Sequence, residues 1–165
     1  MAQEFSFDVV SKIDLQTADD AVNGGSKEIA TRFDFKGSVS SMWLDKKESQ
    51  ITLTSDDEGK LKSVIDILHS RWARRGLPLK ALEAGKIEVA EGATVRQKFK
   101  ILQGIAQDKA KEIVAVVKEN KLKVTPSIQG DQVRVASKSK DELQAAMNLL
   151  KTKDFGLALQ FANFR

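Results

Sequence analysis

The sequence repeats itself, and this internal duplication limits the possible folds more than any other feature. Residues 49–68 align without a gap with residues 131–150, at a constant spacing of 82 positions (131 against 49). A second pair of segments, residues 26–30 and 110–114, matches at a spacing of 84, so a two-residue length change lies between them. The chain is therefore expected to consist of two copies of one structural unit.

Hydrophobic spacing predicts the same order of elements in both copies: strand, helix, strand, strand, helix, strand. Strands are predicted where apolar and polar residues alternate, and helices where apolar residues recur every three or four positions. In the first copy the predicted strands are residues 5–13, 33–44, 49–55 and 77–91 and the helices are 18–32 and 56–72; in the second copy the strands are 95–103, 121–129, 131–137 and 157–164 and the helices are 106–120 and 140–150. This order predicts an α+β protein, a tandem duplication of a ferredoxin-like βαββαβ sandwich with repeats at residues 1–91 and 92–165.

Composition excludes several classes of protein. The chain has no cysteine, which excludes disulfides, thiolate metal sites and cysteine nucleophiles. The N-terminus lacks the pattern of a secretion signal and no apolar run of about 18 residues occurs, so a soluble cytoplasmic protein is expected. A net charge of +4, from 27 basic and 23 acidic residues, is compatible with polyanionic partners.

In a ferredoxin-like fold two helices cover one face of the sheet, and the other face is free to bind. Residues that alternate with the apolar ones are expected on that open face. They are Asp34 and Lys36 in the first copy and Gln132 and Arg134 in the second, with Arg32 at the junction of helix and strand. The cations among them either contact phosphate or belong to a solvated face paired with Asp34.

Aromatic residues offer two further candidates. Phe33 and Phe35 are expected to point inward, where they either stack on a base or belong to the core, as strand aromatics usually do. The C-terminal residues Asn163, Phe164 and Arg165 supply an amide, a ring and a guanidinium, or else they are frayed terminal residues.

Four segments resemble signature segments of the bacterial YajQ family of nucleotide-binding proteins. They are residues 6–11 (SFDVVS), 31–38 (TRFDFKGS), 128–135 (IQGDQVRV) and 159–165 (LQFANFR). The resemblance covers essentially the whole chain and implies two tandem ferredoxin-like domains similar to RNA-recognition modules. It also implies that the domains exchange their first strands, so that residues 5–12 would pair in the second sheet and residues 95–103 in the first.

Family members are described as binding purine nucleotides, some as cyclic di-GMP receptors that act through a transcription factor, and an association with RNA has been proposed. The resemblance thus implies a non-enzymatic protein that senses a purine nucleotide or cyclic di-GMP and signals through a protein partner. The alternative is an RNA- or DNA-associated module that uses the open sheet faces, although residues 49–55 and 131–137, the strands expected to carry stacking rings in such modules, contain no aromatic residue.

An enzyme is not expected, because the chain has neither a Walker-type phosphate loop nor a clear acid–base pair. No cofactor, metal or membrane partner is expected either. The expected nucleotide-binding residues are Arg32, Phe33, Asp34, Phe35, Lys36, Gln132, Arg134, Asn163, Phe164 and Arg165.

Overall fold

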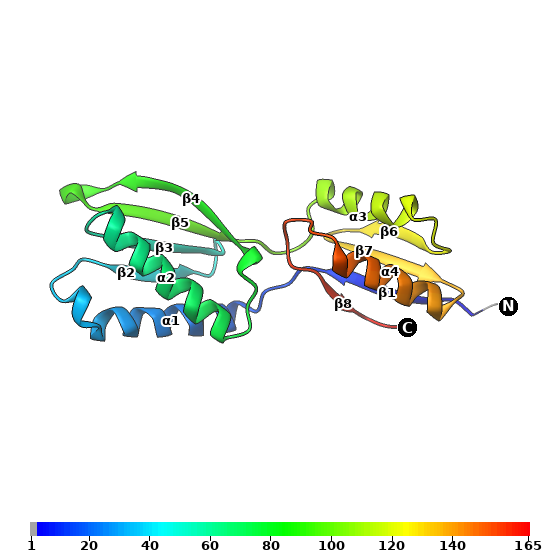
Figure 1. Ribbon diagram of the computed structural model, residues 1–165, viewed down its shortest axis with the longest axis horizontal. Helices are drawn as coiled ribbons and strands as arrows, with labels where there is room; N and C mark the ends of the chain where they lie inside the picture. The colour runs from blue at the N-terminus through cyan, green and yellow to red at the C-terminus, as the bar shows by residue number, and fades with distance from the viewer. Residues whose placement is uncertain (1–2) are drawn as a thin grey trace. The chain divides into compact units, whose positions relative to one another are not determined.

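A computed structural model describes residues 3–165, and this part of the chain divides into two compact units. The central unit is Ile13–Leu102. The C-terminal unit combines the residues up to Lys12 with Gln103–Arg165. Each unit contains one four-stranded antiparallel sheet and two α-helices, which is consistent with two duplicated domains (Figure 1).

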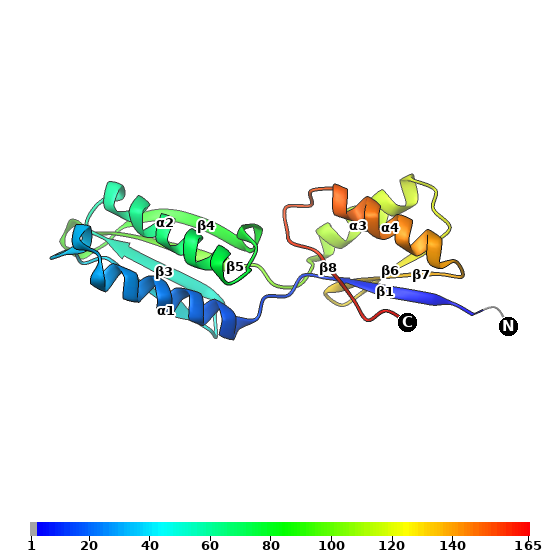
Figure 2. The same ribbon diagram turned by 60° about the horizontal axis from the view of Figure 1, so that its bottom comes forward.

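In the central unit the strand order is β2-β3-β5-β4, and both helices cover the same face of the sheet (Figure 2). The elements are α1 (Leu15–Thr31), β2 (Ser41–Asp45), β3 (Gln50–Ser55), α2 (Glu58–Arg74), β4 (Leu82–Val89) and β5 (Val95–Ile101). Alternation along β3 and β5 buries Ile51, Leu53 and Phe99 against Val22 of α1 and Val64 of α2. Strand β5, which opens the second copy of the sequence, thus lies between the two strands β3 and β4 of the first.

In the C-terminal unit the strand order is β6-β7-β1-β8, so the first strand of the chain lies inside this sheet (Figure 1). The elements are β1 (Phe5–Val10), α3 (Gln107–Glu119), β6 (Thr125–Gln129), β7 (Gln132–Ser137), α4 (Lys140–Thr152) and β8 (Gln160–Ala162). Phe7 and Val9 of β1 join Val133 and Val135 of β7 in a core closed by residues of both helices, among them Ile113. The N-terminal strand is therefore part of the C-terminal hydrophobic core.

Helix α1 continues through two adjacent glycines, Gly24 and Gly25, although each costs about 1 kcal/mol relative to alanine in a helix. The Asp14 side chain caps its start by accepting a hydrogen bond of 3.0 Å from the Gln16 N–H. A Cβ atom at Gly25 would lie 2.6 Å from the Sδ atom of Met42. The missing side chain therefore allows α1 to pack closely on β2.

The prediction of a strand over residues 33–44 was wrong for residues 33–40. Phe33–Phe35 form a 3-10 turn, because the Phe35 N–H bonds to Arg32 O at 3.1 Å and the Lys36 N–H bonds to Phe33 O at 3.0 Å. Asp34 and Lys36 therefore do not lie on a sheet, and Phe33 is 86% exposed instead of pointing inward. The predicted terminal strands are also shorter: Leu79–Ala81 is a 3-10 turn before β4, and β8 covers three residues.

Candidate functional site

The ten residues expected to bind a nucleotide fall into two groups, one on each unit. The central unit carries Arg32, Phe33, Asp34, Phe35 and Lys36, and the C-terminal unit carries Gln132, Arg134, Asn163, Phe164 and Arg165. Each group is therefore a separate candidate site.

The first group forms the turn that connects α1 to β2. After the 3-10 turn, a hydrogen bond of 3.0 Å from the Ser38 N–H to Phe35 O closes a second turn at Gly37. Gly37 has a φ of +77°, which glycine adopts readily and other residues adopt at a cost. Apart from Gly37 and its two chain neighbours, no atom of residues 3–165 lies within 4 Å of where its Cβ would be, so glycine is required here for backbone conformation rather than for space.

The charged residues of this turn bind each other. The Arg32 guanidinium donates to the two carboxylate oxygens of Asp34 at 3.0 and 2.7 Å, and to Glu28 at 3.3 Å. The bond to Asp34 is the main cause of the raised pKa of Arg32, and Arg32 in turn lowers the pKa of Asp34. A phosphate group would have to compete with Asp34 for this arginine.

Phe35 is buried, and two cations contact its ring. The Arg32 guanidinium carbon lies 5.2 Å and the Lys60 Nζ 5.4 Å from the ring centroid. Lys60 also donates to the backbone oxygen of Asp34 at 2.5 Å. Phe35 thus holds the turn against α2, and Phe33 is the exposed ring.

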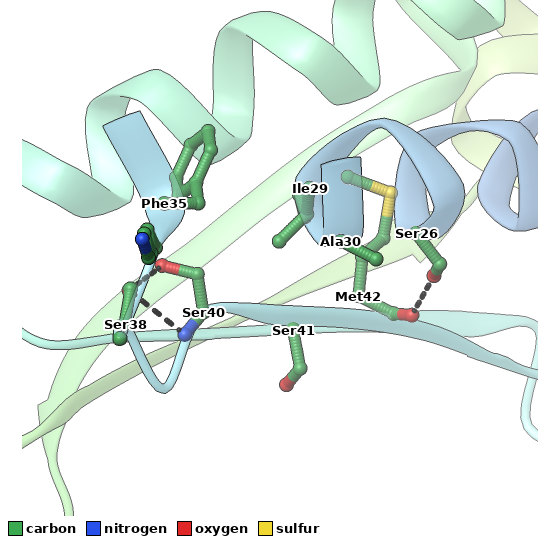
Figure 3. A pocket seen from close by; sticks show the side chains of 10 residues that line it. Ser26, Ile29, Ala30, Phe35, Ser38, Ser40, Ser41 and Met42 are labelled. Carbon is green, nitrogen blue, oxygen red and sulfur yellow. Dashed lines mark hydrogen bonds between the residues drawn. The ribbon is translucent and has the colours of Figure 1, made fainter. Parts of the chain in front are cut away.

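A pocket of about 440 Å³ lies between α1, this turn and the start of β2 (Figure 3). Its lining includes Ile29, Ala30 and Met42 together with the hydroxyl groups of Ser26, Ser38, Ser40 and Ser41. Most of these hydroxyls have protein partners, since Ser26 donates to Met42 O at 2.6 Å and Ser38 donates to the Asp56 carboxylate, whose pKa it lowers. Lys36 supplies the cation of this lining.

The second group is organised around Asp8 of β1, which lies in the signature segment 6–11 but was not among the expected binding residues. Asp8 lies opposite Arg134 in the β1–β7 ladder, and its side chain is only 1% exposed. It accepts hydrogen bonds from Arg134 Nε at 2.9 Å and from Asn163 Nδ2 at 2.7 Å. The bond from Arg134 is the largest cause of the lowered pKa of Asp8. Arg134 is thus paired with a protein carboxylate, and Gln132 lies half-buried at the start of β7.

The last residues of the chain are held in place rather than frayed. Arg165 exchanges backbone hydrogen bonds of 3.0 and 3.3 Å with Ser6, and Asn163 is fixed by Asp8. Phe164 lies between these two attachments, 65% exposed, with its ring centroid 6.3 Å from that of Phe7. An accessible aromatic ring is therefore presented at a defined place on the C-terminal unit.

A pocket of about 490 Å³ lies between β1, α4 and these C-terminal residues. Its apolar lining is Phe5, Phe7, Leu143, Met147 and Phe164, and its polar lining includes Lys140, Gln144 and Arg165. Lys140 Nζ lies 4.8 Å from the centroid of the Phe5 ring. Lys140 and Gln144 were not predicted, because polar residues four positions apart are ordinary on the surface of an amphipathic helix.

These features define the class of the protein: two duplicated α/β units, each with a pocket of small-molecule size. Within residues 3–165, no group of three or more His, Asp or Glu side chains is placed to hold a metal ion. None of the helices in that range is long and apolar enough to cross a membrane.

Comparison with known proteins identifies the family. A family model described as "Nucleotide-binding protein YajQ-like" matches residues 5–165, and the chain belongs to this family. A relative from Elusimicrobium minutum is 54% identical over 98% of this chain and 99% of its own. Relatives from Desulfitobacterium hafniense and Geotalea daltonii are 53% and 52% identical, over 100% and 97% of this chain and 100% and 98% of theirs. All three are named nucleotide-binding proteins.

Proposed function

We propose that this chain binds a purine nucleotide, without turning it over, in the pocket between β1, α4 and the C-terminal residues. The observation that carries the proposal is the exposed ring of Phe164 at a pocket that also contains Lys140 and Arg165. The names of the relatives support the ligand class.

The chemistry of this pocket suits both parts of a nucleotide. A purine stacks on Phe164, with the Met147 thioether and the Phe5 ring as further apolar contacts. The ammonium of Lys140 and the guanidinium of Arg165 are the cations that a phosphate requires. The turn at Gly37 fits less well, because Arg32 is bound to Asp34 and Phe35 is covered.

A non-enzymatic role is supported by the relatives, which are named for binding and not for a reaction. The resemblance of the sequence to the YajQ family adds cyclic di-GMP to the candidate ligands. It also makes a transcription factor the candidate protein that receives the signal. The strand orders support a ferredoxin-like topology in each unit, since β1 and β5 each lie where the first strand of a βαββαβ unit would lie.

Isothermal titration of the full chain with ATP, GTP and cyclic di-GMP tests the site. We expect saturable binding that Lys140→Ala and Phe164→Ala each weaken by about ten-fold or more. Lys36→Ala in the central unit is the matched control and should leave the affinity unchanged. Loss of binding with Lys36→Ala alone would place the nucleotide at Gly37, and an absence of binding would overturn the proposal.

Salt dependence and turnover provide two further checks. A pocket that contacts few phosphates should lose little affinity as salt rises, because the slope follows the number of neutralised phosphates. Incubation with ATP or GTP should release no nucleoside diphosphate. Release in proportion to the protein concentration would refute the non-enzymatic part of the proposal.

A further inference from the structure

Strand β4 is a long sheet edge that the described part of the chain leaves unprotected. An edge strand presents unpaired backbone N–H and C=O groups, with which another strand can pair. Helix α1 covers the edge at β2, where Ser26 donates to Met42 O at 2.6 Å. Strand β6 contains Pro126, which has no N–H, and β8 has three residues. Strand β4 has eight residues, Leu82–Val89, and lies at the outer end of the central sheet (Figure 1).

The second half of β4 directs the backbone groups of two residues away from the sheet. In an antiparallel ladder, alternate residues bond to the neighbouring strand and the residues between them face away from it. Ala90 N–H donates to Thr94 O at 2.8 Å, so Glu88, two residues earlier, also faces β5. The N–H and C=O groups of Ile87 and Val89 therefore lie on the open edge.

The first half of β4 has the same alternation. Ala81 O accepts a hydrogen bond of 2.8 Å from the residue that follows β5, so the backbone groups of Leu82 and Ala84 face outward. The Leu82 N–H already donates to Leu79 O, but the Leu82 C=O and both groups of Ala84 lie on the open edge.

A β-bulge joins the two halves. Ala84 pairs with a residue of β5 two positions away from the partner of Ile87, so two residues of β4, the first of them Gly85, lie opposite Lys98. Gln97 Nε2 donates to Gly85 O at 2.8 Å, and a Cβ atom at Gly85 would lie 2.8 Å from Lys98 O. The bulge therefore depends on this glycine, and it puts the outward-facing residues Ala84 and Ile87 three positions apart instead of two.

Two apolar side chains are exposed along the same edge. Ile87 is 43% and Val89 is 82% exposed. They lie opposite Gln97 and Val95, which are buried on the face that the helices cover. The helices of the central unit thus leave the margin of this face open at β4, and apolar side chains exposed beside an open strand edge indicate a contact surface.

We propose that two copies of the chain pair through β4, antiparallel to each other, about a two-fold axis that passes through the bulge. Ala84 of one copy lies opposite Ile87 of the other, and Leu82 lies opposite Val89. The symmetry produces each pair twice, so the two strands share about six backbone hydrogen bonds. The two four-stranded central sheets then form one continuous sheet.

The spacing of the outward-facing residues selects a second copy as the partner. Leu82, Ala84, Ile87 and Val89 follow one another at steps of two, three and two positions, and this series is the same in both directions. A regular strand has steps of two only and cannot match the central step, so the bulge protects the edge against ordinary strands. Another β4 has the same central step, and only the proposed register sets all four residues opposite one another.

The side chains suit this register on both faces. Directly opposite side chains lie on the same face, so Val89 is covered by Leu82 of the other copy and Ile87 packs beside Ala84. On the open face Glu83 lies opposite Glu88 of the other copy. Each of these carboxylates has a cation of its own sheet beside it, since Glu88 pairs with Arg96 at 2.9 Å and Glu83 lies opposite Lys100.

Sedimentation equilibrium of the full chain tests the pairing. A contact confined to one strand is small, so we expect a reversible dimer that forms as the concentration rises from about 1 to 500 μM. Val89→Lys should weaken the dimer by about ten-fold or more, because it places a charge in each apolar pair. Val39→Lys is the matched control, since Val39 is also an exposed valine of the central unit but lies away from β4. It should leave self-association unchanged.

Disulfide trapping tests the register. The chain has no cysteine, so only introduced thiols react. Ala84→Cys and Ile87→Cys, mixed and treated with oxidised glutathione, should form a crosslinked dimer, because Cα atoms of opposite residues lie about 5.5 Å apart. Each variant alone should crosslink far less, because its two thiols are three residues out of register, about 10 Å apart.

Circular dichroism melts verify that each variant is folded. The proposal is overturned if the chain stays monomeric over the whole concentration range or if Val39→Lys and Val89→Lys have the same effect. It is also overturned if either cysteine variant alone crosslinks as well as the mixture. The proposed nucleotide pocket lies in the C-terminal unit, so nucleotide binding and β4 pairing are lost in different variants and the two proposals fail separately.

Discussion

Replacing Asp8 by alanine should selectively destabilise the C-terminal unit. Asp8 is buried in the middle of β1 and accepts hydrogen bonds from Arg134 and Asn163. The first bond joins β1 to β7 and the second joins β1 to the residues that follow β8. Asp8→Ala removes both bonds and leaves the Arg134 guanidinium beside an apolar side chain.

The size of the effect follows from these two bonds. A hydrogen bond to a charged group contributes about 1.5–3 kcal/mol to stability. The Arg134 side chain is 30% exposed and regains some water when its partner is lost, so the lower end of the range applies. A loss of about 3 kcal/mol is expected for the two bonds together. For a domain of this size, this loss corresponds to a fall in Tm of roughly 12–24 °C.

The distribution of tryptophans makes the assay selective. Both tryptophans of the chain, Trp43 and Trp72, lie in the central unit, so their fluorescence reports the melting of that unit alone. Far-ultraviolet circular dichroism reports both units. In Asp8→Ala we expect a lower transition by circular dichroism and an unchanged transition by fluorescence. An unchanged circular dichroism melt, or an equal shift of both signals, would refute the reasoning.

The contribution of Asp8 to the stability of the folded protein depends on pH in a defined direction. The pKa of Asp8 is lowered in the folded protein, chiefly by the bond from Arg134. Its contribution is therefore fully present above the unfolded pKa, near 3.8, and is lost as the pH falls through the lower folded value. The stability difference between the wild-type protein and Asp8→Ala should be constant near neutral pH and shrink below about pH 3.8.

Two further perturbations test the packing of the units. Deleting residues 1–12 removes the strand between β7 and β8 with its two core side chains, so the C-terminal unit should not fold while the fluorescence melt of the central unit persists; a cooperative melt of the C-terminal unit in the truncated chain would contradict this. Gly25→Ala and Gly24→Ala gain the same helix propensity, but only the first adds a Cβ 2.6 Å from Met42 Sδ, whereas the second meets Arg71 at 3.4 Å. Denaturant titration should therefore find Gly25→Ala less stable than Gly24→Ala by about 1–2 kcal/mol, and equal stabilities would disprove the close contact.

The sequence was enough to predict the four helices, because the apolar residues of each recur at the helical period in both copies of the duplicated unit. It was not enough at Phe33–Lys36, where alternating residues suggested a strand. A 3-10 turn can have the same alternation of residues as a strand. The turn is favoured over the strand here by the left-handed conformation at Gly37 and by the contact of Phe35 with Lys60. Local periodicity contains neither piece of information.

The sequence predicted the residues of a candidate site only where those residues are neighbours in the chain. The C-terminal residues Asn163 to Arg165 were singled out by residue type, but their fixation depends on Asp8 and Ser6, more than 150 positions away. Lys140 enters the pocket only because α4 packs beside β1.

Equivalent positions of the two sheets carry opposite chemistry. The alignment places Thr52 on Arg134, so the row Trp43, Thr52 and Lys98 of the central sheet corresponds to Ser127, Arg134 and Asp8 of the C-terminal sheet. In the C-terminal unit the cation and the carboxylate of this row neutralise each other, and Asn163 covers them. In the central unit threonine cannot neutralise the lysine, and the ring remains exposed. The pocket of the C-terminal unit lies between β1, α4 and the C-terminal residues, whereas that of the central unit lies between α1, the turn at Gly37 and β2, so the two copies of the duplicated scaffold have their pockets in different places.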